Sequence, residues 1–361
     1  MEKVVYILGA GFSAPLNIPV MDNFLMKAKD IYFENPSKYS HFKKIFEIIK
    51  DMSFSKNYYN CDLSNIEEIL SILEMQERFG DKTLKKFFII FIADVIKHFT
   101  PSIEIKPPAI SNHFLVELFS GSNEYAYASF IGNLFNLNIN STYYKSGRWD
   151  FIILKDDKLN CDYSIINLNY DMVLEIFCDL YNKLSKGKSI SFTNSISSKE
   201  NNNMIYLAKL HGSIEHENIV PPTWNKTIDQ NIEKDWKLAF YLLKNANHIR
   251  ILGYSLPETD TYIKYLLKAS VVSAEHLKSI DVICLDDEKN SVKSRYDSFI
   301  EKRYYRFANK NIMKYLRLIA NKSSDFIRSP SPPSMTYHPK DGKSILKFDK
   351  LEETHKQFFN E

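Results

Sequence analysis

A short strand pattern followed by a glycine turn, four residues from the N-terminus, constrains this chain more than any other feature. Residues 4–8 are mostly β-branched or aliphatic, and they lead into residues 9–14, whose sequence is GAGFSA. A strand that turns through glycines into a helix presents backbone amides that can hold a phosphate. Gly9, Gly11 and Ala14 fit the relaxed G-x-G-x-x-G/A spacing of such turns. An ordinary strand-to-helix turn has the same spacing and stays open as the alternative.

The region after the turn is helical in pattern. In a dinucleotide-binding dehydrogenase, a second strand that ends in an acidic residue should follow about 20 positions on. Residues 21–32 instead have a helical pattern, which argues against a dehydrogenase. Ser64 and Glu67 form a capping box for a helix that Gly80 ends, and a broad apolar face over residues 84–99 predicts a buried helix.

The remaining pattern predicts the rest of the fold. More helix is expected from Ser111 to about Phe135, and a hairpin is expected around Ser146-Gly147. Four apolar strands, separated by helical patterns, are then expected at residues 164–168, 205–210, 248–252 and 280–285. The predicted class is α/β, a Rossmann-like parallel sheet with a large mostly helical insertion. Its expected domains are a sheet domain of residues 1–20 and 160–300, an insertion of residues 21–159, and a basic C-terminal helix with a polar tail at residues 301–361.

Composition limits which partners and which cellular compartment are expected for the protein. The net charge of +3 and pI near 8.4 do not demand nucleic acid, although eight Lys or Arg residues between Lys302 and Arg328 leave a local contact open. Ser329–Pro333 is interpreted as a linker. The apolar run Phe87–Val95 is too short to span a bilayer, and the N-terminus has no signal-peptide pattern. Cys61, Cys161, Cys178 and Cys284 form no C-x-x-C pair, so reduced thiols in a cytoplasmic protein are expected.

Polar or glycine motifs follow each of the five expected strands. In an open parallel sheet, ligands bind beyond the carboxyl ends of the strands. The candidate residues at those ends are Gly9, Ala10, Gly11 and Ser13, then Asn169 and Asp171, then His211, then Gly253 and Ser255, and finally Asp286. Each has a structural alternative when taken singly: His211 as a hydrogen-bonded strand-end histidine, Asn169 or Asp171 as a helix cap, and Asp286 as a routine helix start.

Together, these motifs resemble the sirtuin family. The opening GAGFS and Asn17-Ile18-Pro19 are similar to that family's Gly-Ala-Gly-x-Ser and Gly-Ile-Pro, with Asn17 where glycine is usual. The segment from Asn169 to Asp171 is similar to the end of its Gln-Asn-Ile-Asp motif. His211-Gly212 resembles its catalytic His-Gly, and residues 253–255 resemble its Gly-Thr-Ser. The order is the same, and the resemblance covers residues 1–20 and about 160–290.

The departures from the family pattern bear on function. Four scattered cysteines cannot supply the zinc module of the protein deacetylases. Residues 219–224, which include Pro221–Trp224, do not match the Phe-Gly-Glu stretch that helps to hold an acyl-lysine peptide. Trp224 could line the pocket or pack in the core. The chain is more similar to the zinc-free, sirtuin-type NADases of bacterial anti-phage defence.

The resemblance implies roles for the candidate residues. Asn169 would position the nicotinamide ribose and the attacking water, Asp171 would bind the carboxamide or the neighbouring loop, and His211 would contact the ribose hydroxyls as general base. The amides of Ala10 and Gly11, with the Ser13 hydroxyl, would hold the phosphates. Ser255 and Asp286 would serve the adenosine half.

The implied activity is glycosidic cleavage of NAD+ to nicotinamide and ADP-ribose, with NAD+ as substrate and neither zinc nor another cofactor. The family implies an NAD-depleting effector of abortive infection that is activated by assembly of a homo-oligomer or by a separately encoded partner such as an ATP-driven DNA translocase. A non-catalytic NAD or ADP-ribose sensor is the second hypothesis, and an NAD-dependent protein deacylase is the third. The trigger and the formation of a cyclic ADP-ribose product stay open.

Overall fold

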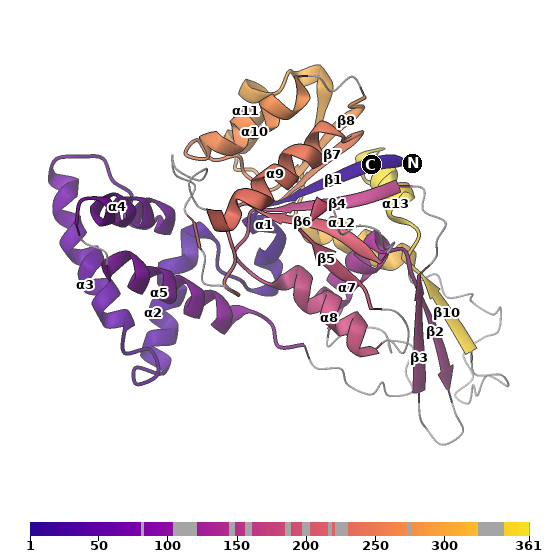
Figure 1. The fold of residues 1–361 in the computed structure, drawn as a ribbon, viewed down its shortest axis with the longest axis horizontal. Helices are drawn as coiled ribbons and strands as arrows, with labels where there is room; N and C mark the ends of the chain where they lie inside the picture. Colours follow the sequence, from indigo (N-terminus) through magenta and orange to yellow (C-terminus); the bar gives the residue numbers. More distant parts are fainter. Residues whose placement is uncertain are drawn as a thin grey trace.

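The computed structural model describes residues 1–80, 83–103, 121–143, 149–155, 161–184, 189–196, 203–215, 219–220, 230–272, 276–323 and 343–360. A seven-stranded sheet in the order β5-β6-β4-β1-β7-β8-β9 forms its centre (Figure 1). All six pairs of neighbouring strands are parallel. The strands are β1 (Glu2–Leu8), β4 (Cys161–Asn167), β5 (Ser191–Thr193), β6 (Met204–Lys209), β7 (His248–Leu252), β8 (Ser279–Cys284) and β9 (Tyr305–Asn309). The predicted α/β fold with a parallel Rossmann-like sheet is confirmed.

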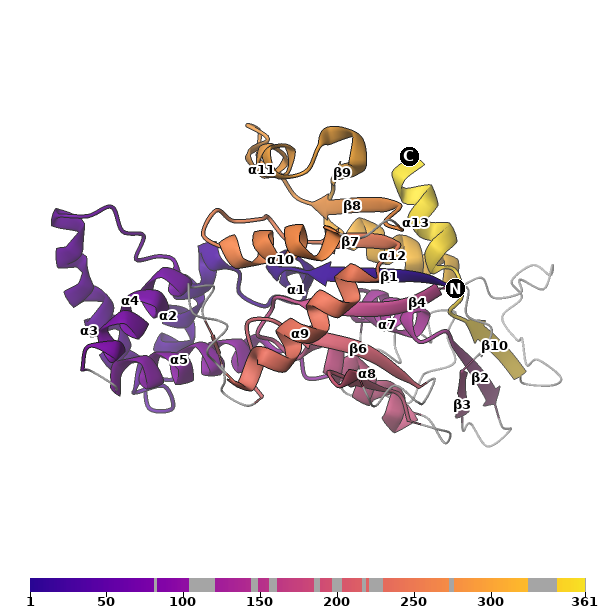
Figure 2. The same cartoon turned by 45° about the horizontal axis from the view of Figure 1, so that its top comes forward.

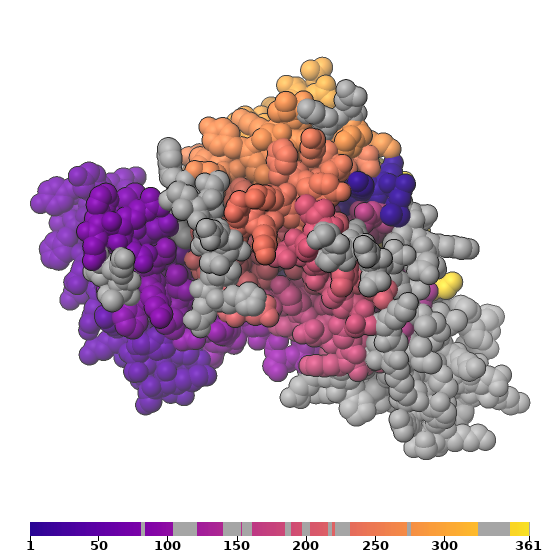
Figure 3. Space-filling model, viewed as in Figure 1, coloured from indigo at the N-terminus to yellow at the C-terminus, as the bar shows by residue number. Residues whose placement is uncertain are grey.

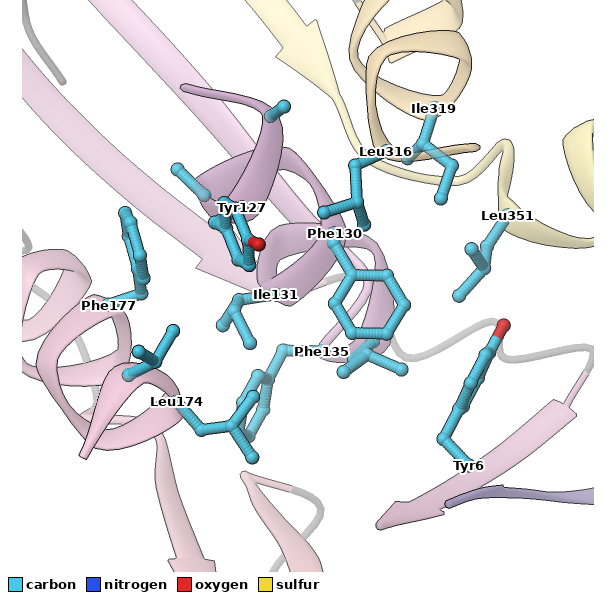
Figure 4. Close-up of a cluster of buried hydrophobic side chains, with 14 of the residues drawn as sticks. Tyr6, Tyr127, Phe130, Ile131, Phe135, Leu174, Phe177, Leu316, Ile319 and Leu351 are labelled. Carbon is cyan, nitrogen blue, oxygen red and sulfur yellow. The ribbon is translucent and has the colours of Figure 1, made fainter. Parts of the chain in front are cut away.

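Both faces of the sheet are covered, which explains why its strands are continuous apolar runs. Side chains alternate along a strand, so Val4, Tyr6 and Leu8 enter one core, whereas Val5 and Ile7 enter the other. The first core is shared with α7 (Ser122–Leu134), α8 (Val173–Leu184) and α12 (Ile312–Ser323), as Figure 4 shows. The second is shared with α9 (Gln230–Lys244), α10 (Thr261–Val271) and α11 (Ser291–Phe299).

A helical lobe stands beyond the carboxyl ends of the strands (Figure 2), and Figure 3 shows it as the indigo and purple part at the left of the molecule. Its helices are α2 (Phe24–Glu34), α3 (Phe42–Met52), α4 (Ile66–Arg78) and α5 (Thr83–Phe99), and they enclose a core of their own. The predicted capping box at Ser64 is wrong. The Asn65 side chain caps α4 by accepting from the amides of Glu67 and Glu68, because Ser64 is turned towards Asp62. Within the described ranges, no helix is long and apolar enough to cross a membrane.

The second half of the predicted insertion packs differently from the first. Helix α7 lies in the core of the central sheet rather than in the lobe. The expected hairpin is present as β2 (Leu137–Tyr143) and β3 (Trp149–Lys155), which pair antiparallel, while its Ser146-Gly147 turn and residues 104–120 lie outside the described residues. The domain limits stay a prediction.

The described part of the C-terminal region contains strands and helices where a basic helix and a polar tail were expected. Strand β9 is the edge strand of the central sheet, and helix α12 packs into the first core. Strand β10 (Lys343–Lys347) pairs with β2, and α13 (Leu351–Asn360) packs into the first core as well. The predicted linker Ser329–Pro333 falls outside the described residues. Helix α13 was not predicted because its sequence is mostly polar. Its buried apolar side chains are Leu351 and Phe358.

A row of polar side chains crosses the sheet beneath α13. Tyr6, Arg250, Asp281 and Arg306 lie side by side on β1, β7, β8 and β9. The Arg250 guanidinium, 3% exposed, binds both oxygens of Glu352 on α13 at 2.8 and 2.6 Å. Burial opposes ionisation of Glu352, yet the charge of Arg250 keeps the pKa of that carboxyl below its ordinary value. This ion pair between a buried arginine and a partly buried glutamate holds α13 on the sheet.

His355 on α13 completes this row through a directional chain of hydrogen bonds. Arg250 donates to the Tyr6 hydroxyl, which lies 3.2 Å from the Tyr315 hydroxyl. The Tyr315 hydroxyl lies 3.1 Å from His355 Nδ1, and His355 Nε2 lies 3.0 Å from Asp281 Oδ2. If each hydroxyl donates once, Nδ1 accepts and Nε2 carries the proton, which is a neutral imidazole. Burial acts in the same direction and lowers the pKa of His355 to about 4.

We expect the folded state to lose stability as the pH falls below 6.5, the ordinary pKa of histidine. The unfolded chain takes up a proton on His355 in this range, whereas the folded chain resists it until pH about 4. The loss between pH 6.5 and about 5 should be about 2 kcal/mol, since one pKa unit corresponds to about 1.4 kcal/mol. Urea unfolding across this range measures it, and His355→Gln should flatten the slope. Equal slopes for wild type and His355→Gln would contradict the assignment.

Candidate active site

The sequence-predicted motifs lie in spatial order along one edge of the sheet. Because β6, β4, β1, β7 and β8 are consecutive and parallel, their carboxyl ends meet at the edge that faces the helical lobe. Backbone hydrogen bonds continue past the strands and join these ends: Leu210 N to Asn167 O, Leu168 N to Leu8 O, Gly9 N to Leu252 O, and Gly253 N to Ile283 O, all between 2.8 and 3.1 Å. The candidate residues are therefore held on a continuous frame.

The two glycine turns pack directly against each other. Gly253 has a left-handed backbone with φ of 65°, and a Cβ placed on it would lie 2.3 Å from Phe12 N. A Cβ on Gly9 would lie 2.6 Å from the Cα of Tyr254. Both positions need glycine because backbone meets backbone there. The glycines thus set the spacing between β1 and β7, which is the switch point of the sheet.

The two amides predicted to hold phosphates differ in their surroundings. The Gly11 amide donates to Gly253 O at 2.9 Å because β7 approaches closely, so it already has a partner within the protein. Its contact with a phosphate stays a prediction. Ala10, in contrast, is exposed at the first position of α1 (Ala10–Ser13).

Asn169 ties the loop after β4 to the glycine turn after β1. Its side chain is 7% exposed and donates from Nδ2 to Gly9 O at 3.0 Å and to Ser13 Oγ at 3.2 Å. Its own amide donates to Asn167 Oδ1 at 3.0 Å. Asn169 and Ser13, predicted to act on the same substrate, are brought together.

Asp171 has the helix-cap role that the sequence left open. Its carboxylate accepts from Val173 N at 3.0 Å at the start of α8. Its carbonyl accepts from Lys209 Nζ at 2.6 Å, and that ammonium also binds Glu175 at 3.0 Å and Ser213 at 3.2 Å. Lys209 therefore joins the loop after β4 to the loop after β6.

His211 follows β6 and is 4% exposed. The next residue, Gly212, has φ of 81°, which turns the chain back so that Val220 N donates to His211 O at 2.9 Å. The Nε2 atom of His211 lies 3.7 Å from Oδ2 of Asp260, whose side chain is buried. Asp260 Oδ2 also accepts from the Tyr254 hydroxyl at 2.8 Å. His211 thus faces a buried carboxylate that sequence analysis did not select.

The two residues predicted for the adenosine half lie on the other side of the glycine turns. Ser255 is half-buried, and its carbonyl accepts from Arg295 Nε at 2.9 Å. The Asp286 carboxylate accepts from Val292 N at 2.8 Å and Lys293 N at 2.9 Å at the start of α11. Asp286 therefore caps a helix, and its part in binding stays a prediction.

The helical lobe reaches the same edge through the loops that carry the candidate residues. Ile214 and Ile219 lie in the lobe core, and Tyr170 and Met172 pack against it. The Tyr170 hydroxyl is buried and has no hydrogen-bond partner among the described residues. Burial, with the charges of Glu67 and Asp260, raises the pKa of Tyr170 well above its ordinary value. Pro221–Trp224 lie outside the described residues.

Asp260 is the principal residue that sequence analysis missed. It is 1% exposed and precedes α10, where an aspartate is an ordinary helix start. No local pattern separates a capping aspartate from one that faces a histidine on another strand. In the described part of the chain, no group of three or more His, Cys, Asp or Glu side chains could hold a metal ion, and the four cysteines are free thiols.

Comparison with known proteins gives structural likeness only. No protein-family model matches the chain, and no curated protein matches it. Solved structures to which the chain is similar include Sir2 proteins. One is Sir2 with the inhibitor EX-527, 2'-O-acetyl-ADP-ribose and a deacetylated p53 peptide, at 12% identity and a TM-score of 0.33, covering 89% of this chain and 93% of that chain.

Two further structures show the same level of likeness. Sir2Tm bound to a propionylated peptide has 12% identity and a TM-score of 0.35, covering 89% of this chain and 92% of that chain. A Sir2 structure with a p53 peptide and NAD+ has 12% identity and a TM-score of 0.32, with the same two coverages of 89% and 92%. Scores this low carry no argument about the site, which is therefore argued from its own residues.

Proposed function

We propose that this protein is an NAD+ glycohydrolase that cleaves NAD+ to nicotinamide and ADP-ribose. The observation that carries the proposal is the convergence of Asn169, Ser13 and His211 at the switch point of a parallel sheet. Asn169 Nδ2 lies 3.2 Å from Ser13 Oγ, and the loops that bear Asn169 and His211 are hydrogen-bonded to each other through Ile214 N and Tyr170 O at 3.0 Å. These residues belong to the motifs that are similar to those of sirtuins.

The chemistry needs few groups. When the bond between C1' of the ribose and the nicotinamide nitrogen breaks, the bonding electrons leave with nicotinamide, and positive charge builds on the ribose. A water oxygen then bonds to C1', and the proton it loses goes to a base and from there to solvent. A neutral imidazole suits this base because its ordinary pKa lies near 6.5. His211 is the proposed base, and the Asn169 amide is proposed to hold the ribose and the water.

Burial along the edge favours one orientation of the substrate. His211, Asn169 and Asp171 are almost fully enclosed, whereas Ala10 is exposed and Gly11 and Ser255 are half-buried. Enclosed polar groups act more strongly on developing charge because water does not screen them. We therefore place the nicotinamide ribose near His211, the phosphates near Ala10, and the adenosine near Ser255.

Wild-type protein incubated with NAD+ should release nicotinamide and ADP-ribose in equal amounts, measured by liquid chromatography. Release is expected with the purified protein or after addition of a candidate activator. Thermal unfolding with and without NAD+ measures binding separately. If NAD+ binds but no nicotinamide is released under any condition, the protein is a sensor and not an enzyme. If NAD+ is consumed only when an acetylated peptide is present, the protein is a deacylase. A cyclic product would appear as a separate peak in the same chromatogram.

The biological setting of the proposal rests on the motif resemblance. An enzyme that depletes NAD+ harms its own cell, so it must stay inactive until a trigger arrives. We propose an effector of anti-phage defence that is controlled by homo-oligomer assembly or by a separately encoded partner such as an ATP-driven DNA translocase. The contacts of Tyr170 and Ile214 with the helical lobe support control through that lobe, because the same loops carry Asn169 and His211.

A further inference from the structure

His211 and Asp260 come from parts of the chain that are not neighbours in the sheet. His211 follows β6, whereas Asp260 lies in the segment between β7 and α10, and β4 and β1 separate β6 from β7 in the sheet. The side chains are nonetheless 3.7 Å apart between Nε2 and Oδ2, with 5% and 2% of their side-chain surfaces exposed. Burying a carboxylate is unfavourable unless other groups compensate its charge. The approach of these two groups therefore needs an explanation.

The Asp260 carboxyl is held next to the imidazole by hydrogen bonds from the turn that precedes α10. The Tyr254 hydroxyl donates to Oδ2 at 2.8 Å. The backbone of Tyr254 is held in turn, because the Tyr296 hydroxyl donates to the Tyr254 carbonyl at 2.8 Å. The backbone nitrogen of Asp260 donates to Pro257 O at 3.2 Å, so the turn before α10 is fixed as well. The carboxylate is thus held in place by groups that do not belong to the loop of His211.

Other charged and titratable groups of the described residues also lie near His211. Tyr170 faces it with ring centroids 6.1 Å apart. From the helical lobe, the charge of Glu67 acts on the hydroxyls of Tyr170 and Tyr254. The Lys209 ammonium is bound by Glu175 at 3.0 Å. Asp260 is therefore the carboxylate in a position to act directly on the imidazole.

We infer that Asp260 is a positioning residue that orients His211 and stabilises its protonated form while it holds the proton taken from water. The inference rests on the proposed function in assigning that proton to His211. When the imidazole becomes a cation, the buried carboxylate supplies the opposite charge at short range, which lowers the energy of the charged state. Asp260 does not contact the substrate in this scheme and keeps no proton itself.

The test compares Asp260→Asn with Tyr254→Phe, because the two changes should act in opposite directions. Asp260→Asn keeps the shape and removes the charge, so the pKa of His211 should fall by about one unit. Tyr254→Phe removes the hydrogen bond that the Tyr254 hydroxyl donates to the Asp260 carboxylate. Without this bond the carboxylate attracts the protonated imidazole more strongly, so the pKa of His211 should rise. NMR titration of the imidazole signals, with His211→Gln to assign them, measures both. The control is Asp235→Asn, which changes a buried carboxylate bound instead by Lys209 N at 2.9 Å and should leave the pKa of His211 in place.

Turnover supplies a second readout. Asp260→Asn should lower kcat roughly 10- to 100-fold, because the carboxylate that orients the His211 imidazole is lost. The acidic limb of the pH profile should move to lower pH, because the pKa of His211 falls. A purely structural role would lower the amount of folded protein and leave that limb in place. An unchanged His211 pKa in Asp260→Asn overturns the inference. If Asp260→Asn does not fold, absence of a rise in Tyr254→Phe overturns it. If wild type releases no nicotinamide, the proposed function fails. The NMR titration still shows whether Asp260 acts on the His211 imidazole.

Discussion

Replacement of His211 by alanine is expected to lower nicotinamide release by a factor of roughly 10² to 10⁴, the usual contribution of a general base. The imidazole is the proposed acceptor of the water proton, and Asp260 cannot take its place at that position. The loss should appear in kcat rather than in KM, because the base acts on the bond being formed and not on the bound ground state. Initial rates over a series of NAD+ concentrations separate these two constants.

His248→Ala is the matched control for this experiment. His248 lies at the start of β7, so it is at the amino ends of the strands, whereas the candidate site is at their carboxyl ends. Its side chain binds Glu2 and Ser279 at 2.9 Å each. Its removal should leave turnover within about twofold of wild type once folded protein is matched, because a surface ion pair contributes at most about 1 kcal/mol to stability. Equal activity of His211→Ala and wild type would remove His211 from the mechanism.

Asn169→Ala should also abolish turnover, but it carries a structural cost. Removal of the amide leaves Gly9 O and Ser13 Oγ without the donor that now lies at 3.0 and 3.2 Å. Lost hydrogen bonds of this kind cost about 1–3 kcal/mol when the remaining group stays buried. Activity must therefore be compared at equal folded fractions, which urea unfolding provides. Full activity in properly folded Asn169→Ala would contradict the assigned site.

Glu352→Ala is expected to lower the free energy of unfolding by about 3–5 kcal/mol. The change leaves the Arg250 guanidinium buried without its carboxylate, which now binds it at 2.6 and 2.8 Å. It also removes the acceptor of the Tyr163 hydroxyl at 2.8 Å. Such a loss is a large part of the 5–15 kcal/mol that stabilises an ordinary domain. Urea unfolding followed by circular dichroism measures it.

The adjacent residue of the same helix supplies the control. Glu353 is also a glutamate on α13, but its side chain is 60% exposed and its partner Lys322 lies 3.0 Å away. Glu353→Ala should lower the free energy of unfolding far less than Glu352→Ala does, because water screens exposed ion pairs. The double variant Arg250→Met with Glu352→Leu should regain much of the stability, since it removes the buried guanidinium together with its partner. A cost for Glu352→Ala no greater than that for Glu353→Ala would mean that the buried pair does not hold α13.

The strands that were predicted and those that were missed differ in burial. β1, β4, β6, β7 and β8 are buried on both faces, so they appear in the sequence as apolar runs. β5 and β9 lie at the two ends of the sheet, and both are half-buried or exposed along their length. Their sequences, SFT and YRFAN, carry no such run. Edge strands are specified by the partner they meet, which a linear pattern does not contain.

The same distinction applies to the candidate site. The sequence places Asn169 and His211 correctly after their strands because chain position fixes where a strand ends. It cannot show that Gly253 O would take up the Gly11 amide, because that bond depends on how closely β1 and β7 approach. Nor can it select Asp260, whose importance arises only when the turn before α10 reaches the loop of His211. Pairwise approach between distant segments is the information that was missing.

The core of the helical lobe includes residues from outside the lobe. Ile214 and Ile219 are buried in it at 3% and 2% exposure, and they lie on the segment that begins at His211. Excision of the lobe would expose these side chains to water and remove the surface that shapes the loop. We therefore expect the lobe and the sheet to unfold in one cooperative transition rather than two. The insertion is in this sense not a detachable module, and a shorter version of the protein that keeps only the sheet would not keep the site.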